Sequence, residues 1–376
     1  MNGEKCQKRE QIAQQIVPAF AVDGQLAGVL PYGNGHINDT FAAYFQMNDG
    51  SMRRTIIQRI NTDVFKNPDE LMENVIGVTS FLKKRILEEG GNPERETLTV
   101  IPTKDEKSYM TDSQGNCWRC YSFVEDTVTY QMVEKPEDFY TVARAFGHFQ
   151  MLLADYPAHT LHETIPLFHD TPNRYRNFIK ALKEDNLGRA ANVQKEIDFV
   201  REREAFTHLL TDLQKKGELP LRVTHNDTKL NNILIDKATG RGLCVIDLDT
   251  VMPGLALNDY GDSIRFGAST ALEDEQDLDK VSMDLQLFEL FTKGFLETAG
   301  RVLTDKEIEM LPAGAKMMTL ECGMRFLTDY LEGDTYFKIH REGHNLDRAR
   351  TQFKLVYDME QKWAQMQAIV QKYAGR

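Results

Sequence analysis

The spacing of hydrophobic and polar residues changes about a third of the way along the chain, and this change divides it into two parts. In the first part, short apolar runs such as 40–45 and 54–60 are separated by turn residues, and the Asn-Asp-Gly sequence at 48–50 is typical of a β-hairpin. Residues 100–110 and 118–124 have the same character. This part is therefore predicted to be a small sheet.

One helix is expected within the same part. Asn67 is suited to an N-cap and Pro68 to the first helical position, and apolar residues then recur every three or four positions. Gly90 and Gly91 follow the last of them and are typical of a helix end. The pattern thus predicts one long helix beside the sheet.

The second part is mostly of helical period. Apolar residues recur at helical spacing over 139–153 and again over 353–370, and we expect these faces to form the core. One interruption consists of two short apolar runs, 232–235 and 243–246, joined by a polar turn. A mainly helical part with one hairpin is predicted.

Composition narrows the class of protein. A chain of 376 residues is long enough for two lobes, and none of its apolar runs approaches the ~20 residues that a membrane helix needs. The polar N-terminus leads into no signal-peptide core, and five cysteines is a low, odd count. We expect a cytoplasmic protein with reduced thiols and no membrane association.

Charge and cysteine spacing exclude two further classes of site. The net charge of −12 argues against nucleic acid as a partner, whereas a nucleotide remains compatible because magnesium supplies positive charge locally. Cys117 and Cys120 form a C-x-x-C, but no second pair of zinc ligands follows. We therefore interpret these cysteines as structural.

The most informative motif lies around the predicted hairpin. His225, Asp227 and Asn232 form H-x-D-x-x-x-x-N, and Asp247 and Asp249 follow at the end of the second apolar run. These residue types, in this order, are typical of the catalytic loop of kinase-like phosphotransferases. Alternatively, the first three are ordinary turn residues, but the hairpin and the acidic pair that follow favour the catalytic interpretation.

Each residue of the motif has a predicted role. Asp227 would accept or orient the proton of a substrate hydroxyl, and Lys229 would neutralise charge on the transferring phosphoryl group. If the hairpin forms, Asn232 and Asp247 lie at the same end of it and offer hard oxygen ligands to Mg²⁺. Asp249 is predicted to bind the metal directly or through water.

The first part offers candidates for binding a nucleotide. Gly33 and Gly35 lie between the first predicted strands, where glycine lets backbone N–H groups approach phosphates, although a plain β-turn would look the same. Protein kinases carry a lysine on their third strand, and here Gln58 and Arg59 occupy that run instead. Either is a candidate to replace it, with Glu73 on the following helix as a partner.

Together these features predict an α+β, two-lobed, protein-kinase-like fold. The N-terminal nucleotide-binding lobe would be small and β-rich and comprise residues 1–125. The C-terminal lobe, residues 126–376, would be larger, mainly helical and catalytic.

Longer segments carry a family resemblance that extends over nearly the whole chain. The sequence resembles the aminoglycoside phosphotransferase and choline kinase superfamily, and within it most closely the N-acetylhexosamine 1-kinases. The segments that carry the resemblance are 31–38, 168–172, 221–234, 246–250, 260–275 and 321–327.

The resemblance implies ATP as cosubstrate, Mg²⁺ as cofactor and the C1 hydroxyl of N-acetylglucosamine or N-acetylgalactosamine as acceptor, giving the α-1-phosphate. It also implies that Asp227 is the catalytic aspartate and that Asn232 and Asp247 are metal ligands. It places Arg325 and Tyr336 at the sugar, so the C-terminal lobe would also bind the substrate. Alternatively, Arg325 pairs with Glu321 or Asp329 on one helix face. Weaker candidates near the nucleotide and the sugar are His36 and Asn226.

Two alternatives stay open at this stage. The chain could be a kinase of another small-molecule hydroxyl, such as that of choline, homoserine or an aminoglycoside, on the same fold. It could also be an inactive nucleotide-binding regulatory protein, although Asp227, Asn232 and Asp247 together argue against this. As partners we expect ATP and an N-acetylhexosamine, and the protein is expected to be a monomer or weak homodimer.

Overall fold

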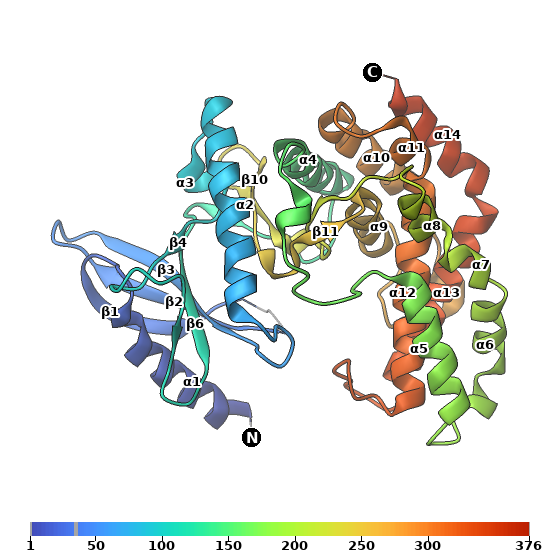
Figure 1. The fold of residues 1–376 in the computed structure, drawn as a ribbon, viewed down its shortest axis with the longest axis horizontal. Helices are drawn as coiled ribbons and strands as arrows, with labels where there is room; N and C mark the ends of the chain where they lie inside the picture. Colours follow the sequence, from blue (N-terminus) through green and yellow to red (C-terminus); the bar gives the residue numbers. More distant parts are fainter. Residues whose placement is uncertain (1, 34–36, 376) are drawn as a thin grey trace. The chain divides into compact units, whose positions relative to one another are not determined.

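A computed structural model describes residues 2–33 and 37–375, with side chains from residue 9 onward. The chain forms two compact units (Figure 1). Unit 1 comprises Met1–Thr127 and Leu243–Asp249, and unit 2 comprises Val128–Gly242 and Thr250–Arg376. The lobe boundary at residue 125 stays a prediction, and the short segment Leu243–Asp249 joins unit 1 although the chain around it belongs to unit 2.

Unit 1 is built on an antiparallel sheet. Its strands are ordered β1-β2-β3-β6-β4, and β5 also pairs with β6. The predicted hairpin at 48–50 is confirmed: it joins β2 to β3, and Gly50 adopts a left-handed φ of +82° that the turn requires. The strands are β1 (Gln25–Pro31), β2 (Asp39–Gln46), β3 (Met52–Ile60), β4 (Val100–Ile101), β5 (Met110–Thr111) and β6 (Cys117–Ser122).

The predicted strand over 100–110 is wrong. β4 and β5 are two separate two-residue strands, because the chain between them turns sharply. In that turn the Thr103 N–H donates to the Lys107 carbonyl at 2.8 Å, and Glu106 takes a left-handed φ of +63°. The polar run of charged residues there favours a turn over a continuous strand.

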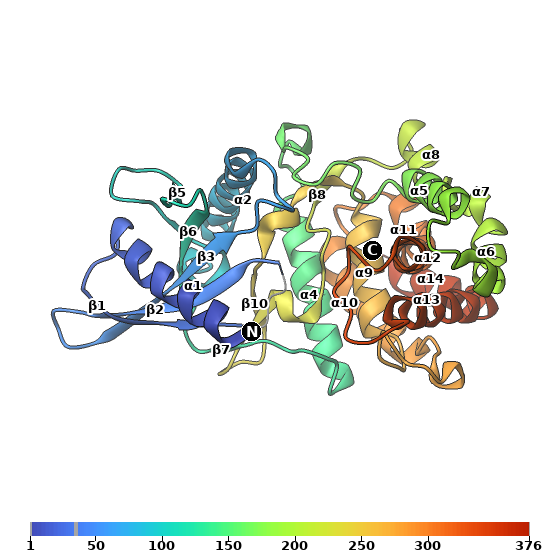
Figure 2. The same cartoon turned by 90° about the horizontal axis from the view of Figure 1, so that it is seen from below.

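Helices cover both faces of this sheet (Figure 2). The predicted helix is confirmed as α2 (Pro68–Glu88): the Asn67 side chain accepts a hydrogen bond from the Glu70 N–H as N-cap, and Pro68 is at the first position. The sequence pattern did not predict α1 (Asn2–Ile16), which is followed by a 3₁₀ turn (Val17–Ala19). The apolar side chains that pack α1 and this turn against the sheet are Ala13, Ile16, Val17 and Phe20. One further short helix is α3 (Pro93–Glu96).

The C-x-x-C lies within β6, and its geometry supports a structural role. Residues three apart on a strand point to opposite faces of the sheet, so Cys117 and Cys120 cannot approach each other. Cys120 is buried in the core that α1 covers, while the Cys117 sulfur lies 3.8 Å from the Thr111 hydroxyl. Both are free thiols.

Unit 2 is mainly helical. Of its strands, β8 (Arg222–Thr224) pairs antiparallel with β11 (Met252–Gly254), and β9 (Ile233–Asp236) precedes the predicted polar turn. The junctions between the units carry β7 (Thr127–Val128) and β10 (Gly242–Val245). The helices are α4 (Pro136–Leu152), α5 (Thr171–Glu184), α6 (Gln194–Arg201), α7 (Glu204–Thr207), α8 (Leu209–Lys215), α9 (Ala256–Gly267), α10 (Leu285–Ala299), α11 (Asp305–Glu309), α12 (Leu311–Glu332), α13 (His344–Gln361) and α14 (Trp363–Ala374). The α+β class, with one small β-rich part and a larger, mainly helical part, is confirmed.

The long helix α12 is the centre of unit 2, packed against α5, α9 and α13 (Figure 1). It approaches α9 most closely where Gly261 meets Gly314, and a Cβ added to Gly261 would lie 2.4 Å from the Gly314 carbonyl oxygen. Two glycines therefore let the helix backbones come together. This crossing determines the position of α9, which holds the catalytic loop.

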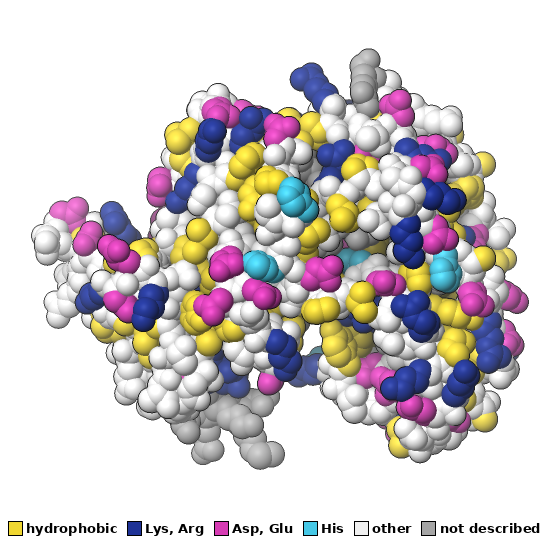
Figure 3. Space-filling view, viewed as in Figure 1, with side chains coloured by type: hydrophobic (Ala, Val, Ile, Leu, Met, Phe, Trp, Pro, Cys, Tyr) yellow, Lys and Arg dark blue, Asp and Glu magenta, His cyan; other side chains and the backbone are white. Residues whose placement is uncertain are grey.

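Acidic and basic side chains are interspersed over the face shown in Figure 3. Within the described part of the chain, no helix is both long enough and apolar enough to cross a membrane.

The α9–α12 crossing gives a first prediction. Gly261→Ala should lower the free energy of unfolding by about 1–3 kcal/mol, because the added methyl group overpacks against backbone that cannot move aside. Urea denaturation followed by circular dichroism would measure it. The matched control is Gly28→Ala on β1, where an added Cβ meets no atom within 4 Å. Equal stability of both variants would contradict the proposed close packing.

Candidate active site

The predicted catalytic loop follows β8 and is anchored through its backbone by α9. The Asp259 carboxylate accepts hydrogen bonds from the His225 N–H at 2.9 Å and from the Asn226 N–H at 2.7 Å. The Gln150 side-chain amide donates a third, at 2.7 Å. Asp259 is 2% exposed. Because burial raises the pKa of Asp259, these donors are needed to stabilise its charged form.

A second set of bonds holds the next residue of the loop. The Thr228 N–H donates to Asp262 at 3.1 Å, and the Thr228 hydroxyl donates to the Asp259 carbonyl at 2.6 Å. The Ser263 hydroxyl in turn donates to the Thr228 carbonyl at 2.9 Å. Sequence reasoning assigned no role to Asp259, Asp262 or Ser263, although all lie on or beside the family-like segment 260–275. The signal was the polar, glycine-containing composition of an otherwise buried helix.

His225 and Asn226 fix the shape of the loop. The His225 ring is buried against Phe146 and Phe149 of α4, with ring centroids 5.8 and 6.1 Å away. Asn226 takes a left-handed φ of +62°, and its amide donates to the Thr250 carbonyl at 2.9 Å. Strained backbone of this kind persists only where the surroundings hold it, and it is concentrated at functional sites.

Three predicted residues come together on this loop. The Lys229 ammonium lies 2.7 Å from Asp227 Oδ1, and the Asn232 amide nitrogen donates to the Asp227 carbonyl at 2.8 Å. Both Asp227 and Lys229 are partly exposed, so a reactant can reach them. Burial acts to lower the pKa of Lys229, but the Asp227 charge outweighs it and the net pKa is raised. Lys229 therefore carries a positive charge at neutral pH.

The same contact bears on the metal. Because the Asn232 amide nitrogen is engaged by Asp227, the amide oxygen is the atom oriented to serve as a ligand. Asp247 takes a left-handed φ of +61°, another unusual backbone conformation at a predicted functional residue. Amide and carboxylate oxygens fit the ligand preference of Mg²⁺. The donor set of the chain therefore suits such an ion.

Arg325 and Tyr336 are also brought together. The guanidinium of Arg325, on α12, donates to the Tyr336 hydroxyl at 3.4 Å, and Tyr336 is 66% exposed. The loop that carries Tyr336 is held by Asp329, whose carboxylate accepts from the N–H groups of residues 335, 336 and 337 at 2.9, 2.8 and 2.9 Å. An exposed tyrosine is thus presented on a well-anchored loop.

His169 and Glu321 connect this region to the catalytic loop. Sequence reasoning did not single out His169, and it considered Glu321 only as an ion-pair partner of Arg325. His169 Nδ1 lies 3.0 Å from Glu321 on α12, and its Nε2 lies 3.4 Å from the Asn226 carbonyl. Burial acts to raise the pKa of Glu321, but the charges of His169, Arg325 and Arg174 outweigh it and the pKa is lowered. Both residues fall in segments that carried the family resemblance. Their contact, which connects α12 to the catalytic loop, is evident only in the three-dimensional structure.

The residues of unit 1 that were predicted to bind the nucleotide differ in their surroundings. Gly33 has a φ of +75°, whereas Gly35 and His36 lie outside the described residues. Gln58 lies on β3 directly opposite Arg119 of β6 and accepts two hydrogen bonds from its guanidinium, at 3.1 and 2.9 Å. Arg59 instead pairs with Asp39 at 2.5 Å.

Asp249 is also engaged by Arg119. Its Oδ1 lies 2.6 Å from an Arg119 nitrogen, and its Oδ2 accepts from the Asn38 amide at 2.6 Å. Both Asp249 and Arg119 are almost fully buried. Sequence reasoning did not assign a role to Arg119.

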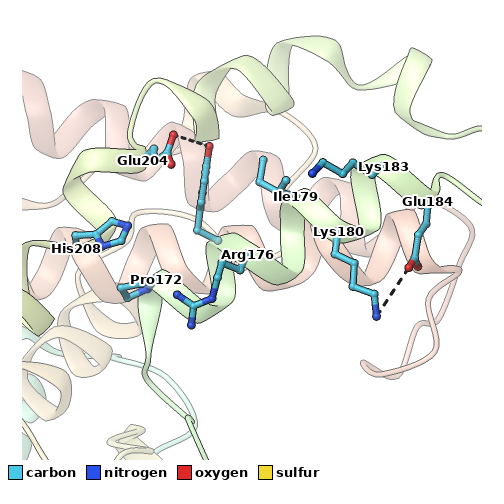
Figure 4. Close-up of a pocket in the computed structure, with 9 residues that line it drawn as sticks. Pro172, Arg176, Ile179, Lys180, Lys183, Glu184, Glu204 and His208 are labelled. Atoms are coloured by element: carbon cyan, nitrogen blue, oxygen red, sulfur yellow. Dashed lines mark hydrogen bonds and ion pairs between the residues drawn. The ribbon is translucent and has the colours of Figure 1, made fainter.

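A surface groove of about 740 Å³ on unit 2 lies apart from these residues (Figure 4). It shares no lining residue with the catalytic loop, and its polar side chains pair locally, as Tyr175 does with Glu204 at 3.0 Å. Its lining consists of Pro172, Tyr175, Arg176, Ile179, Lys180, Lys183, Glu184, Glu204 and His208. None of the predicted catalytic or metal-binding residues lines this groove.

Comparison with known families decides the class. Residues 102–290, half of the chain, match the APH family of phosphotransferase enzymes. The chain belongs to this phosphotransferase family. The matched range includes the catalytic loop and the Asp247–Asp249 segment, so the hydrogen-bonded loop described above is part of a phosphotransferase.

Solved structures of similar fold support the kinase-like assignment. An aminoglycoside phosphotransferase from Alicyclobacillus acidocaldarius has a TM-score of 0.60 at 13% identity, covering 96% of each chain. A microcompartment-associated aminopropanol kinase has 0.57 at 15% identity, covering 95% of this chain and 98% of its own. An amicoumacin kinase in complex with AMP-PNP and Ca²⁺ has 0.56 at 13%, covering 94% and 96%. The kinase-like fold of the phosphotransferase is confirmed, while the narrower resemblance to N-acetylhexosamine 1-kinases stays a prediction.

The anchoring of the loop gives a second prediction. Asp259→Ala should lower the free energy of unfolding by about 3 kcal/mol, because buried donors lose their acceptor, and Asp259→Asn should lower it less because one oxygen is kept. Chemical denaturation of both variants would measure this. As a control, the exposed Asp279→Ala should change stability by less than about 0.5 kcal/mol. A loss no larger in Asp259→Ala than in the control would rule out the anchoring role.

Proposed function

We propose that this phosphotransferase is an ATP- and Mg²⁺-dependent anomeric kinase that phosphorylates the C1 hydroxyl of N-acetylglucosamine or N-acetylgalactosamine to the α-1-phosphate. The observation that carries the proposal is the Asp227–Lys229–Asn232 cluster on a loop whose backbone α9 holds in place. A carboxylate, an ammonium group and an amide so arranged suit phosphoryl transfer, where positioning and charge stabilisation supply most of the barrier reduction.

In this proposal Asp227 acts on the acceptor hydroxyl. Its carboxylate accepts the proton as the hydroxyl oxygen attacks the γ-phosphorus, and the bond from that phosphorus to the bridging oxygen of ADP breaks. An anomeric hydroxyl is more acidic than an ordinary alcohol, so the demand on the base is modest. Lys229, adjacent to Asp227, stabilises the charge on the transferring group.

The metal and the nucleotide complete the site. Bound Mg²⁺ would neutralise charge on the β- and γ-phosphates, and the oxygens of Asn232 and Asp247 are the proposed ligands. Gly33 is the proposed phosphate contact, because glycine with a left-handed φ of +75° lets its backbone N–H approach a phosphate.

The acceptor side favours a neutral substrate over a cation. Burial and the nearby Arg325 charge lower the pKa of Arg174, which indicates positive potential between the two guanidinium groups. The nearby Glu321 carboxylate is buried and already paired with His169 at 3.0 Å. A substrate ammonium group would meet like charges here, whereas a sugar hydroxyl can accept hydrogen bonds from arginine.

The aromatic residues nearby do not favour choline. A quaternary ammonium group is held by an aromatic cage, and three rings do gather here. They already surround Arg325, whose guanidinium carbon lies 5.4, 5.8 and 5.3 Å from the ring centres of Phe168, Tyr336 and Phe337. We therefore propose that Arg325 and Tyr336 hold the sugar, through planar donors and an exposed ring.

The acceptor can be tested directly. ATP consumption should be highest with the two N-acetylhexosamines and at least ~10²-fold lower with the cations choline and kanamycin, since placing like charges together costs several kcal/mol. Homoserine, a zwitterion, is assayed in the same panel. Phosphorus NMR of the product should show coupling to the anomeric proton. Preference for a cationic acceptor, or a 6-phosphate product, would overturn the sugar 1-kinase proposal.

The catalytic role of Asp227 gives a separate prediction. Asp227→Asn keeps the size of the side chain but loses the base, so turnover should fall by at least ~10²-fold while the thermal transition stays unchanged. A coupled ADP-release assay and a melting curve would measure both. Asp279→Asn, an exposed change elsewhere in unit 2, serves as control and should retain activity. Normal turnover in Asp227→Asn would exclude this role.

A further inference from the structure

Arg119 is a fully buried cation that the proposed reaction does not yet use. Its side chain is 1% exposed, and a guanidinium removed from water is tolerated only when it is paired and hydrogen-bonded. Its partners within unit 1 are the Asp249 carboxylate at 2.6 Å and the Gln58 amide oxygen at 3.1 and 2.9 Å. The first of these belongs to the Ile-Asp-Leu-Asp segment that ends the second apolar run.

The position of Arg119 explains the absent lysine on the third strand. In protein kinases that lysine pairs with a glutamate on the following helix, and the ion pair must be in place for activity. Here β3 offers Gln58, which lies directly opposite Arg119, so both side chains project from the same face of the sheet. The following helix, α2, offers Met72, whose sulfur lies 3.9 Å from the guanidinium. Here the buried cation lies on β6, and its carboxylate partner is Asp249.

Asp249 is held at both oxygens. While Oδ1 faces Arg119, Oδ2 accepts from the Asn38 side-chain amide nitrogen at 2.6 Å, and the Asn38 side-chain amide oxygen accepts from the Asn61 N–H at 3.0 Å. Two residues before it, Asp247 has a left-handed backbone with a φ of +61°. A non-glycine residue keeps such a conformation only where neighbouring contacts enforce it, and the clamp on Asp249 is such a contact.

We infer that Arg119 is a positioning residue that fixes the Asp247–Asp249 segment through Asp249, so that Asp247 is presented to Mg²⁺. Asp249 then serves as the partner of the arginine rather than as a direct ligand. The inference rests on the proposed Mg²⁺- and ATP-dependent function and deepens it. In this inference the Arg119–Asp249 ion pair, which joins β6 to the Asp247–Asp249 segment, takes the role that the third-strand lysine and its helix glutamate have in protein kinases.

The test separates positioning from simple folding. Arg119→Met alone leaves Asp249 buried without its cation, so this variant should melt at a lower temperature or fail to fold. The double variant Arg119→Met/Asp249→Asn removes both charges and should melt close to wild type. Binding of a fluorescent ATP analogue is then titrated with MgCl₂, with no acceptor present, for the wild type, the double variant and Arg119→Lys.

The inference predicts that the folded double variant needs at least ~10-fold more Mg²⁺ for half-maximal nucleotide binding, the scale seen when a residue that orients a metal ligand is removed. Arg119→Lys, which keeps the charge but not the two-armed geometry, should fall between the two. A matched control is Arg203→Met/Glu360→Gln in unit 2, which removes an ion pair with contacts of 3.0 and 2.7 Å and should leave the titration unchanged.

The outcomes distinguish this inference from the proposed function. If the wild type binds the nucleotide analogue with Mg²⁺ and the folded double variant shows the same Mg²⁺ requirement, Arg119 has only a structural role and the inference is overturned. If the wild type shows no Mg²⁺-dependent binding at all, the proposed function fails first, and the inference fails with it.

Discussion

The catalytic loop depends on one buried carboxylate. Asp259 accepts hydrogen bonds from two successive backbone N–H groups of the loop and from Gln150, and without them the cost of burying its charge would be large. The loop and the helix therefore stabilise each other: the donors offset the cost of burying the Asp259 side chain, and Asp259 holds Asn226 in its left-handed backbone conformation. The position of Asp227 depends on these hydrogen bonds between the loop and α9. It therefore also depends on the Gly261–Gly314 contact, which sets the position of α9 against α12.

The same device recurs at two other places. Asp329 accepts from three consecutive N–H groups and holds the loop that carries Tyr336. Asp249, in unit 1, is held by Arg119 and Asn38 beside the strained Asp247. In each case a buried carboxylate with directional partners fixes a short segment that lies outside the α-helices and the sheets. A phosphotransferase needs such rigidity because its chemistry relies on positioning.

Much of the fold could be predicted because its signals are local. The hairpin at 48–50 and the helix from Pro68 follow from turn and capping residues that act over a few positions. The same approach failed for 100–110, where β-prone residues flank a charged turn, and it missed α1, whose apolar anchors are concentrated at its C-terminal end. Periodicity reports only on elements with a sustained apolar face.

The sequence by itself determined the motif of Asp227, Asn232 and Asp247, because the spacing of the residues in a catalytic loop can be read along the chain. Tertiary structure alone decided which distant residues serve it. Arg119 and Asp249 are 130 positions apart, Gln150 and Asp259 are 109 apart, and His169 and Glu321 are 152 apart. Each is an ordinary polar residue in its local context. Their pairing is enforced by burial, which makes an unpartnered charge costly and so selects one arrangement that no local pattern records.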